Sequence, residues 1–157
     1  MVHRTYIGLG TPDAAVREFD ALAPHVVEML TMQGECAANG PDHAAMGVAL
    51  DGVQTAAYHF TRRPHFYHAL LEQHRMSRRG ANGRLSDRAE AITAFRALAP
   101  YHSALQGLQG RCRPFGRDYL ALEVAKQGLD TAAFHFTGEA AFYGARGDSA
   151  GPTRPRL

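Results

Sequence analysis

The chain has 157 residues, a formal net charge of +2 and an apolar fraction of 45%. This length predicts one globular domain, and the charge is too small to indicate a nucleic-acid partner. No apolar run approaches the roughly 20 residues that cross a bilayer, and the N-terminus lacks the apolar stretch of a signal peptide. We therefore expect a cytoplasmic protein without membrane contact; the oligomeric state stays open.

The first predicted elements are a short N-terminal segment and a helix. Residues 2–9 are short and partly β-branched, so they form either a strand or an ordered arm. Thr11 is a capping hydroxyl, Pro12 suits the first helical turn, and Asp13 is a carboxylate at the positive end of the helix dipole. Pro24 then interrupts the helical pattern, which predicts a kink or two short helices.

A second helix is predicted over residues 42–60. Met46, Leu50, Val53, Ala57 and Phe60 follow one another at steps of four and three, which is typical of an amphipathic helix. The alternative is a hairpin turning at residues 51–52, because Asp-Gly is a good two-residue turn. The helix is favoured.

Pro64 is expected to open a last helix that runs through Arg75. The next residues, 76–86, form a predicted linker, and residues 147–157 form a predicted mobile tail rich in Gly, Pro and Arg. Several arginines gather in and around the linker, and we interpret them as solvated rather than as a phosphate or RNA site. These arginines are Arg75, Arg78, Arg79, Arg84 and Arg88.

The sequence repeats at an offset of 76 residues. Residues 52–61 (GVQTAAYHFT) align with residues 128–137 (GLDTAAFHFT), and the ungapped pairing of 15–70 with 91–146 has 24 identities in 56 positions. Chance would give roughly one in fifteen at average composition. We therefore predict an all-α fold: a tandem duplication of a three- to four-helix unit, with repeats 11–75 and 87–146, packed into one domain with pseudo-two-fold symmetry.

Each repeat also has a Gly that opens its long helix. The segments are Gly40-Pro41-Asp42-His43 and Gly116-Arg117-Asp118-Tyr119. This layout resembles the N-terminal double repeat of Clp-family ATPases, in which Gly-Thr-Glu-His opens a helix; the second segment has Tyr in place of His. The resemblance implies a module that binds adaptors and substrates.

Residues kept in both repeats are the candidates for a shared site. Thr55 lies four residues before His59, on the same helix face, so its hydroxyl could orient the imidazole. The alternative is a His that stabilises a helix C-terminus. The cysteines are interpreted as buried, with a redox pair left open. The candidate ligand-binding residues are His59, His135, Thr55, Thr131, Tyr67, Tyr143, Cys36 and Cys112.

The first repeat is richer in histidine than the second. His65 and His68 are three residues apart, so with His59 they form a candidate site for a divalent transition metal; solvated histidines are the alternative. The first repeat also holds His25, His43 and His74, whose counterparts 76 residues on are Tyr101, Tyr119 and Ala150.

The leading hypothesis is therefore a protein that binds a small molecule or a metal at the junction of the repeats. The alternatives are a protein-interaction module without a catalytic site, or a small enzyme that uses His with Tyr or Cys as acid and base. Catalytic residues are not assigned, because the sequence has no zinc-protease, phosphate-loop or nucleophile-elbow motif.

Overall fold

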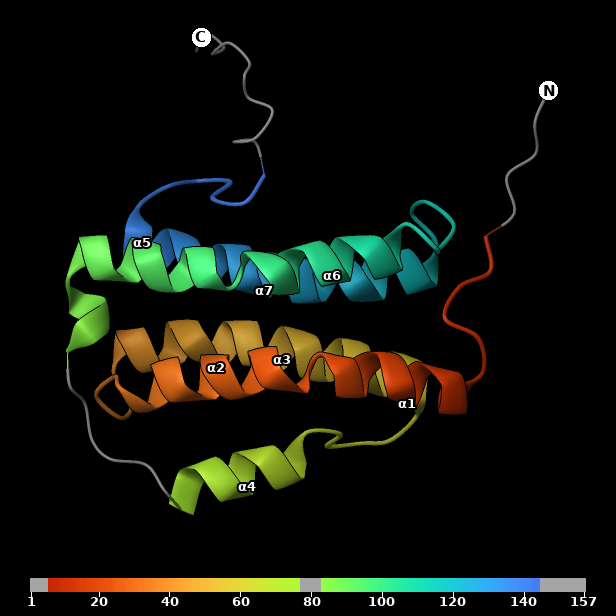
Figure 1. Ribbon diagram of the computed structural model, residues 1–157, viewed down its shortest axis with the longest axis horizontal. Helices are drawn as coiled ribbons and strands as arrows, with labels where there is room; N and C mark the ends of the chain where they lie inside the picture. The colour runs from red at the N-terminus through yellow and green to blue at the C-terminus, as the bar shows by residue number, and fades with distance from the viewer. Residues whose placement is uncertain (1–5, 77–82, 145–157) are drawn as a thin grey trace, which may run out of the picture.

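The helices follow the order predicted from the sequence (Figure 1). The computed structural model describes residues 6–76 and 83–144, and within these residues it holds seven α-helices, one 3-10 helix and no strand. The elements are α1 (Pro12–Ala21), α2 (Ala23–Gly34), α3 (Pro41–Thr61), α4 (His68–Met76), η1 (Arg84–Ser86), α5 (Arg88–Ala97), α6 (Ala99–Gln109) and α7 (Arg117–Thr137). The prediction of an all-α fold is confirmed, and the helices form one compact domain.

The predicted break at Pro24 separates α1 from α2. The Thr11 side chain accepts a hydrogen bond from the Ala14 N–H at 3.1 Å and so caps α1. Pro24 lies in the first turn of α2, where its missing N–H leaves no helical bond unmade. Pro100 has the same place in α6, after α5.

The two long helices, α3 and α7, run antiparallel and form the centre of the molecule. Their backbones approach closely where Gly52 of α3 meets α7 and Gly128 of α7 meets α3. A Cβ atom on Gly52 would lie 2.8 Å from the Val124 carbonyl oxygen, and one on Gly128 would lie 2.7 Å from the Val48 carbonyl oxygen. Because Gly52 lies inside a continuous helix, the hairpin alternative is excluded.

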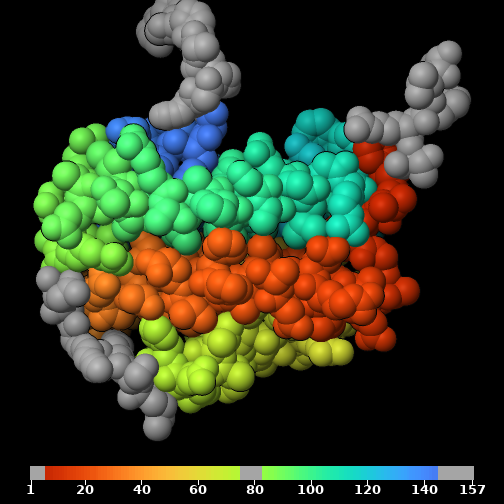
Figure 2. Space-filling model, in the orientation of Figure 1, coloured from red at the N-terminus to blue at the C-terminus, as the bar shows by residue number. Residues whose placement is uncertain are grey.

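The shorter helices cover one side of this central pair. In Figure 1, α1 and α2 lie in front of α3, and α6 lies in front of α7, in agreement with the packing of these pairs. The surfaces of the two front groups meet along a long seam (Figure 2). The buried core runs through both groups, with Phe19, Met29, Phe95 and Tyr101 fully enclosed.

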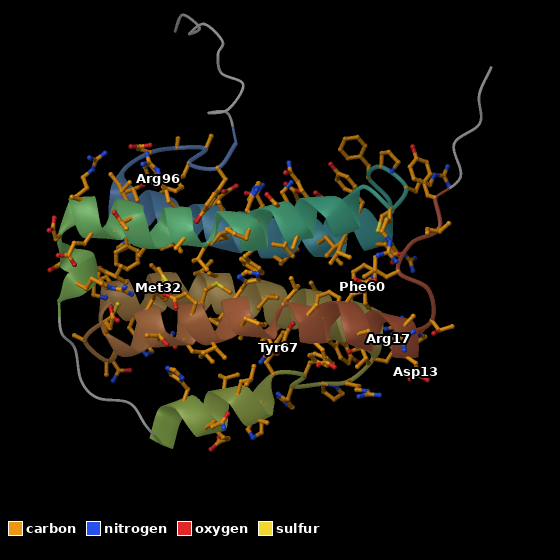
Figure 3. All side chains as sticks on the ribbon, viewed as in Figure 1. Asp13, Arg17, Met32, Phe60, Tyr67 and Arg96 are labelled. Atoms are coloured by element: carbon orange, nitrogen blue, oxygen red, sulfur yellow. The ribbon has the colours of Figure 1, made fainter. Side chains whose placement is uncertain are left out.

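The helix expected to begin at Pro64 begins instead at His68. His65 has a left-handed backbone (φ 58°), which no α-helix accepts, so residues 64–67 form a turn. The turn is held by Tyr67, which Figure 3 labels below α1. Its N–H donates to Gln54 Oε1 at 3.2 Å, and its hydroxyl donates to the Phe19 carbonyl at 2.6 Å.

The chain before α1 lies against the second half of the molecule. The Gly8 N–H donates to the Arg111 carbonyl at 2.8 Å, and Arg111 Nε donates back to the Gly8 carbonyl at 3.1 Å. Residues 6–10 thus form an arm without a strand; the rest of the predicted N-terminal segment lies outside the described residues.

The predicted linker and tail lie mostly outside the described residues, at 77–82 and 145–157. Of the linker, η1 is described: its Leu85 is buried, and Arg84 Nε donates to Glu35 Oε1 at 2.8 Å. In the described ranges 6–76 and 83–144, the helices are too short or too polar to cross a membrane.

Candidate functional site

The side of α3 and α7 that faces away from the shorter helices is uncovered and apolar. In most proteins, exposed large apolar side chains are scattered singly. Here five of them lie on these two helices, and the largest exposed fraction among them is 54%, at Phe134. They are Val48 and Tyr58 on α3, and Leu120, Val124 and Phe134 on α7.

The helical period explains why this face forms. Exposed residues of α7 recur at steps of three and four, and the buried seam of α7 occupies the opposite side. A helix that packs on one side presents its other side to solvent, where polar residues are expected. The outer stripe of α7 is instead partly apolar: Leu120, Val124, Gln127, Thr131 and Phe134.

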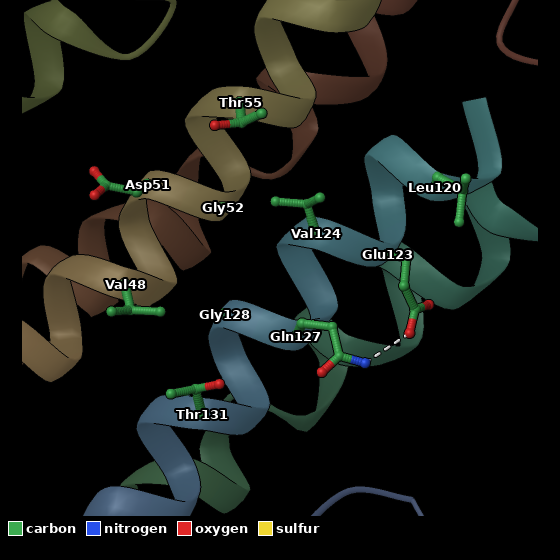
Figure 4. Close-up of a pocket in the computed structure, with 10 residues that line it drawn as sticks. All are labelled: Val48, Asp51, Gly52, Thr55, Leu120, Glu123, Val124, Gln127, Gly128 and Thr131. Carbon is green, nitrogen blue, oxygen red and sulfur yellow. Dashed lines mark hydrogen bonds between the residues drawn. The ribbon is translucent and has the colours of Figure 1, made fainter. Parts of the chain in front are cut away.

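A shallow groove of about 520 Å³ lies in the middle of this face, between the two helices (Figure 4). Its floor is the close crossing of the backbones at Gly52 and Gly128. Apolar side chains and the methyl-bearing threonines line its walls, and both helices contribute. The wall residues are Val48, Thr55, Leu120, Val124 and Thr131.

The two edges of the groove are acidic. Figure 4 shows Asp51 on the side of α3 away from α7, and Glu123 on the side of α7 away from α3. Hydrogen bonds from Gln109 and Gln127 hold the pKa of Glu123 below its ordinary value, and nearby Lys126 adds to this effect. The groove lining includes no basic side chain, so its two fixed charges have the same sign.

Behind Glu123, the second half of the molecule has a polar network that our sequence analysis missed. Lys126 Nζ donates to Gln109 Oε1 at 3.0 Å, and Gln109 Nε2 donates to Glu123 Oε1 at 2.8 Å. The one signal in the sequence was a lysine at a position of the helix seam that Leu50 fills in the first half. Partners from α6 could not be assigned from that signal.

Three more titratable groups lie buried in this half. Burial, with Lys126 nearby, lowers the pKa of His102, whose ring stacks on Tyr143 at 4.9 Å. Burial raises the pKa of Asp130 and that of Tyr101. The Tyr101 hydroxyl and Asp130 Oδ1 are buried without a hydrogen-bond partner in the part of the chain that the structure describes.

The structure places the two conserved-position histidines apart rather than together. His59 Nε2 donates to Asp118 Oδ1 at 2.8 Å, and His135 Nε2 donates to Asp42 Oδ1 at 2.7 Å. Each pair joins the last turn of one long helix to the first turn of the other, so the two pairs lie at opposite ends of the antiparallel helices. Both charges are well placed for the helix dipoles, as the structural alternative expected.

The threonines are separate from the imidazoles. The imidazole of each histidine is bonded to an aspartate, while Thr55 and Thr131 line the groove. Of the predicted ligand-binding residues, these two alone contribute to the groove on the α3–α7 face.

The tyrosines have partners within the core. Tyr67 and Tyr143 each donate a hydroxyl hydrogen bond of 2.6 Å, to the Phe19 and Phe95 carbonyls respectively. Burial raises the pKa of both phenols. They therefore cap the ends of α1 and α5.

The cysteines are free thiols. The Cys36 thiol donates to the Met32 carbonyl at 3.4 Å, and that of Cys112 donates to the Leu108 carbonyl at 3.5 Å. Burial, with Asp42 and Glu35 nearby, raises the pKa of Cys36 to about 11, and burial also raises that of Cys112. Protonated thiols are poor nucleophiles and poor metal ligands.

The candidate metal ligands do not converge. The rings of His65 and His68 are 6.2 Å apart, and His59 is bonded to Asp118. Across residues 6–76 and 83–144, no three His, Cys, Asp or Glu side chains gather as a metal site. Comparison with family models, with curated proteins and with solved structures found no match to the chain.

Proposed function

We propose that this protein is an interaction module that binds an α-helix of a partner protein on the outer face of α3 and α7. The observation that carries the proposal is the group of five exposed apolar side chains around an open groove between these helices. A helix that lays an apolar stripe into such a groove is a recurring mode of protein recognition. The groove also lies where the two halves meet, the place expected for a binding site.

We further propose that the halves arose by tandem duplication and are related by a pseudo-two-fold axis. The support is that contacts recur 76 residues apart: the Tyr67–Phe19 and Tyr143–Phe95 bonds, and the two crossed His–Asp pairs. The axis would pass through the groove, so a duplicated unit would create this face from two copies of one helix.

The shape of the face favours a helix over a small molecule. Each central helix has 21 residues and so extends for about 30 Å, the length of several helical turns. Small-molecule sites bury most of their ligand in a concave pocket, whereas this groove is shallow. A second copy of the chain is disfavoured, because a symmetric contact would bring the Asp51 and Glu123 edges of both copies together.

The test uses a designed 18-residue helical peptide with Leu and Ala on one face and Gln elsewhere. We expect binding that Val48→Gln and Val124→Gln each weaken by about tenfold, the loss expected for one buried valine. Val27→Gln is the matched control, because Val27 is exposed on α2, outside the groove. Fluorescence anisotropy of labelled peptide measures the dissociation constants.

Three outcomes would contradict the proposal. The peptide fails to bind, or it binds and the Val27 control weakens it as much as the groove variants do. Alternatively, sedimentation equilibrium finds a dimer that Val124→Gln dissociates, which would assign the face to a second copy. An apolar dye that binds in place of the peptide, and is lost in Val124→Gln, would instead support a small-molecule site.

A further inference from the structure

The acidic edges of the groove limit the kind of helix that fits it. Asp51 and Glu123 lie on opposite edges, and no basic residue lies in the lining. A helix seated in the groove would bring its flanking positions next to these two carboxylates. Those flanking positions are therefore the part of the partner that the charges select.

The Glu123 charge is held in place by its neighbours. Its carboxylate accepts hydrogen bonds of 2.8 Å from Gln109 Nε2 and from Gln127 Nε2. Lys126 Nζ lies 3.8 Å from Glu123 Oε1 and 15% of its side chain is exposed, so this cation lies mainly inside the protein. The edge of the groove thus presents a fixed anion to solvent, ready to meet a cation without rearrangement.

Resting on the docking function proposed above, we infer that the partner helix is basic: an apolar stripe flanked by Lys or Arg on both sides. One basic side chain would pair with Asp51 and another with Glu123, while the stripe covers Val48, Leu120 and Val124. Both charges of the groove would then be paired, which a neutral or an acidic helix cannot do.

Three peptides with one apolar face test this inference. The flanking positions hold Lys in the first, Gln in the second and Glu in the third. At low salt we expect the Lys peptide to bind about tenfold more tightly than the Glu peptide, with the Gln peptide between them. The difference should shrink between 0.02 and 0.5 M NaCl, because exposed charge pairs are screened by salt.

Variants locate the effect. Asp51→Gln introduces the residue that α7 has at the corresponding position, Gln127, and should reduce the Lys-to-Glu ratio by about threefold. Glu90→Gln is the matched control: this carboxylate is exposed on α5, outside the groove, and should leave the ratio unchanged.

The outcomes separate the two proposals. If all three peptides bind equally, or if Glu90→Gln changes the ratio as much as Asp51→Gln does, the basic partner is wrong and the docking face stands. If none of the three binds, the docking function itself is overturned. A ratio that favours Lys, falls with salt and depends on Asp51 supports the inference.

Discussion

The two halves of the molecule have the same helical frame but fill it differently. At one seam position the first half has Leu50, which is buried, and the second half has Lys126. Gln33 and Gln109, which lie 76 residues apart, both donate to a carbonyl of the next long helix, at 3.2 and 3.1 Å. The frame therefore accepts either an apolar or a charged residue at this place.

What allows the charge is a second substitution one helical turn away. The first half has Gly47 where the second half has Glu123, which accepts from Gln109 and lies 3.8 Å from Lys126 Nζ. A half-buried ammonium without such partners would be costly. The comparison teaches that the polar filling is a unit, whose members depend on one another.

The largest expected effect comes from separating that unit. Leu50→Lys buries an ammonium group in a half that has no glutamate to pair with it, and should lower the free energy of unfolding by about 3–5 kcal/mol. The reverse change, Lys126→Leu, should cost only about 1–2 kcal/mol, because Glu123 keeps two amide donors. Urea denaturation followed by circular dichroism measures both.

A double variant provides the control. Gly47→Glu with Leu50→Lys introduces both charged residues, and a Cβ at Gly47 has room, since its nearest atom, Gln33 Nε2, lies at 3.5 Å. The double variant should be more stable than Leu50→Lys alone. Equal stability would mean that the polar residues of the second half do not act together.

The next effect tests the feature that the halves share most closely, the helix crossing. Gly52→Ala and Gly128→Ala each place a methyl group less than 3 Å from a carbonyl oxygen of the opposite helix. Each should destabilise the fold by about 1–3 kcal/mol, as overpacking does. Thermal unfolding should rank the two substitutions as nearly equal.

Gly107→Ala is the control for helix propensity. Nothing lies within 4 Å of a Cβ atom at Gly107, which is exposed on α6. This change should stabilise the protein by about 0.5–1 kcal/mol, the usual gain of Ala over Gly in a helix. If the crossing glycines also gave a gain, α3 and α7 would be farther apart than described.

A smaller effect is expected at the tyrosine caps. Tyr67→Phe and Tyr143→Phe each remove one hydrogen bond to a helix-end carbonyl and should cost about 0.5–1.5 kcal/mol. Tyr67 should cost more, because it is the more buried of the two. Tyr58→Phe is the control: Tyr58 is exposed, so the change should stay within about 0.5 kcal/mol.

The sequence was sufficient to predict the helices and the breaks between them, because these depend on local signals. Pro24, the Thr11 cap and the seam of residues 42–60 each act within a few residues of their position. The start of the last helix of the first repeat was misplaced, because His65 adopts a left-handed backbone and Tyr67 is held by distant partners.

The site was harder to predict for a physical reason. The groove exists only where α3 and α7 cross, and which side of each helix stays uncovered depends on the packing of all the others. Thr55 and Thr131 were proposed because they recur, and they do line the groove. His59 and His135 recur as well, yet they bond to aspartates at opposite ends, since the helices are antiparallel.

The smallest effect concerns acid stability, where the halves differ at His102 and its counterpart Val26. Burial and the nearby Lys126 lower the pKa of His102 in the folded protein. Between the folded and unfolded pKa values, the unfolded chain binds more protons, so stability is full above the unfolded value of about 6.5 and is lost as pH falls below it. His102→Val should therefore lose less stability between pH 7.5 and pH 5.5 than the parent protein does. Urea denaturation at both pH values measures the difference, in which the contributions of His25 and Asp130 cancel because both variants retain them. An equal loss in the two proteins would show that burial of His102 does not produce the acid sensitivity of the second half.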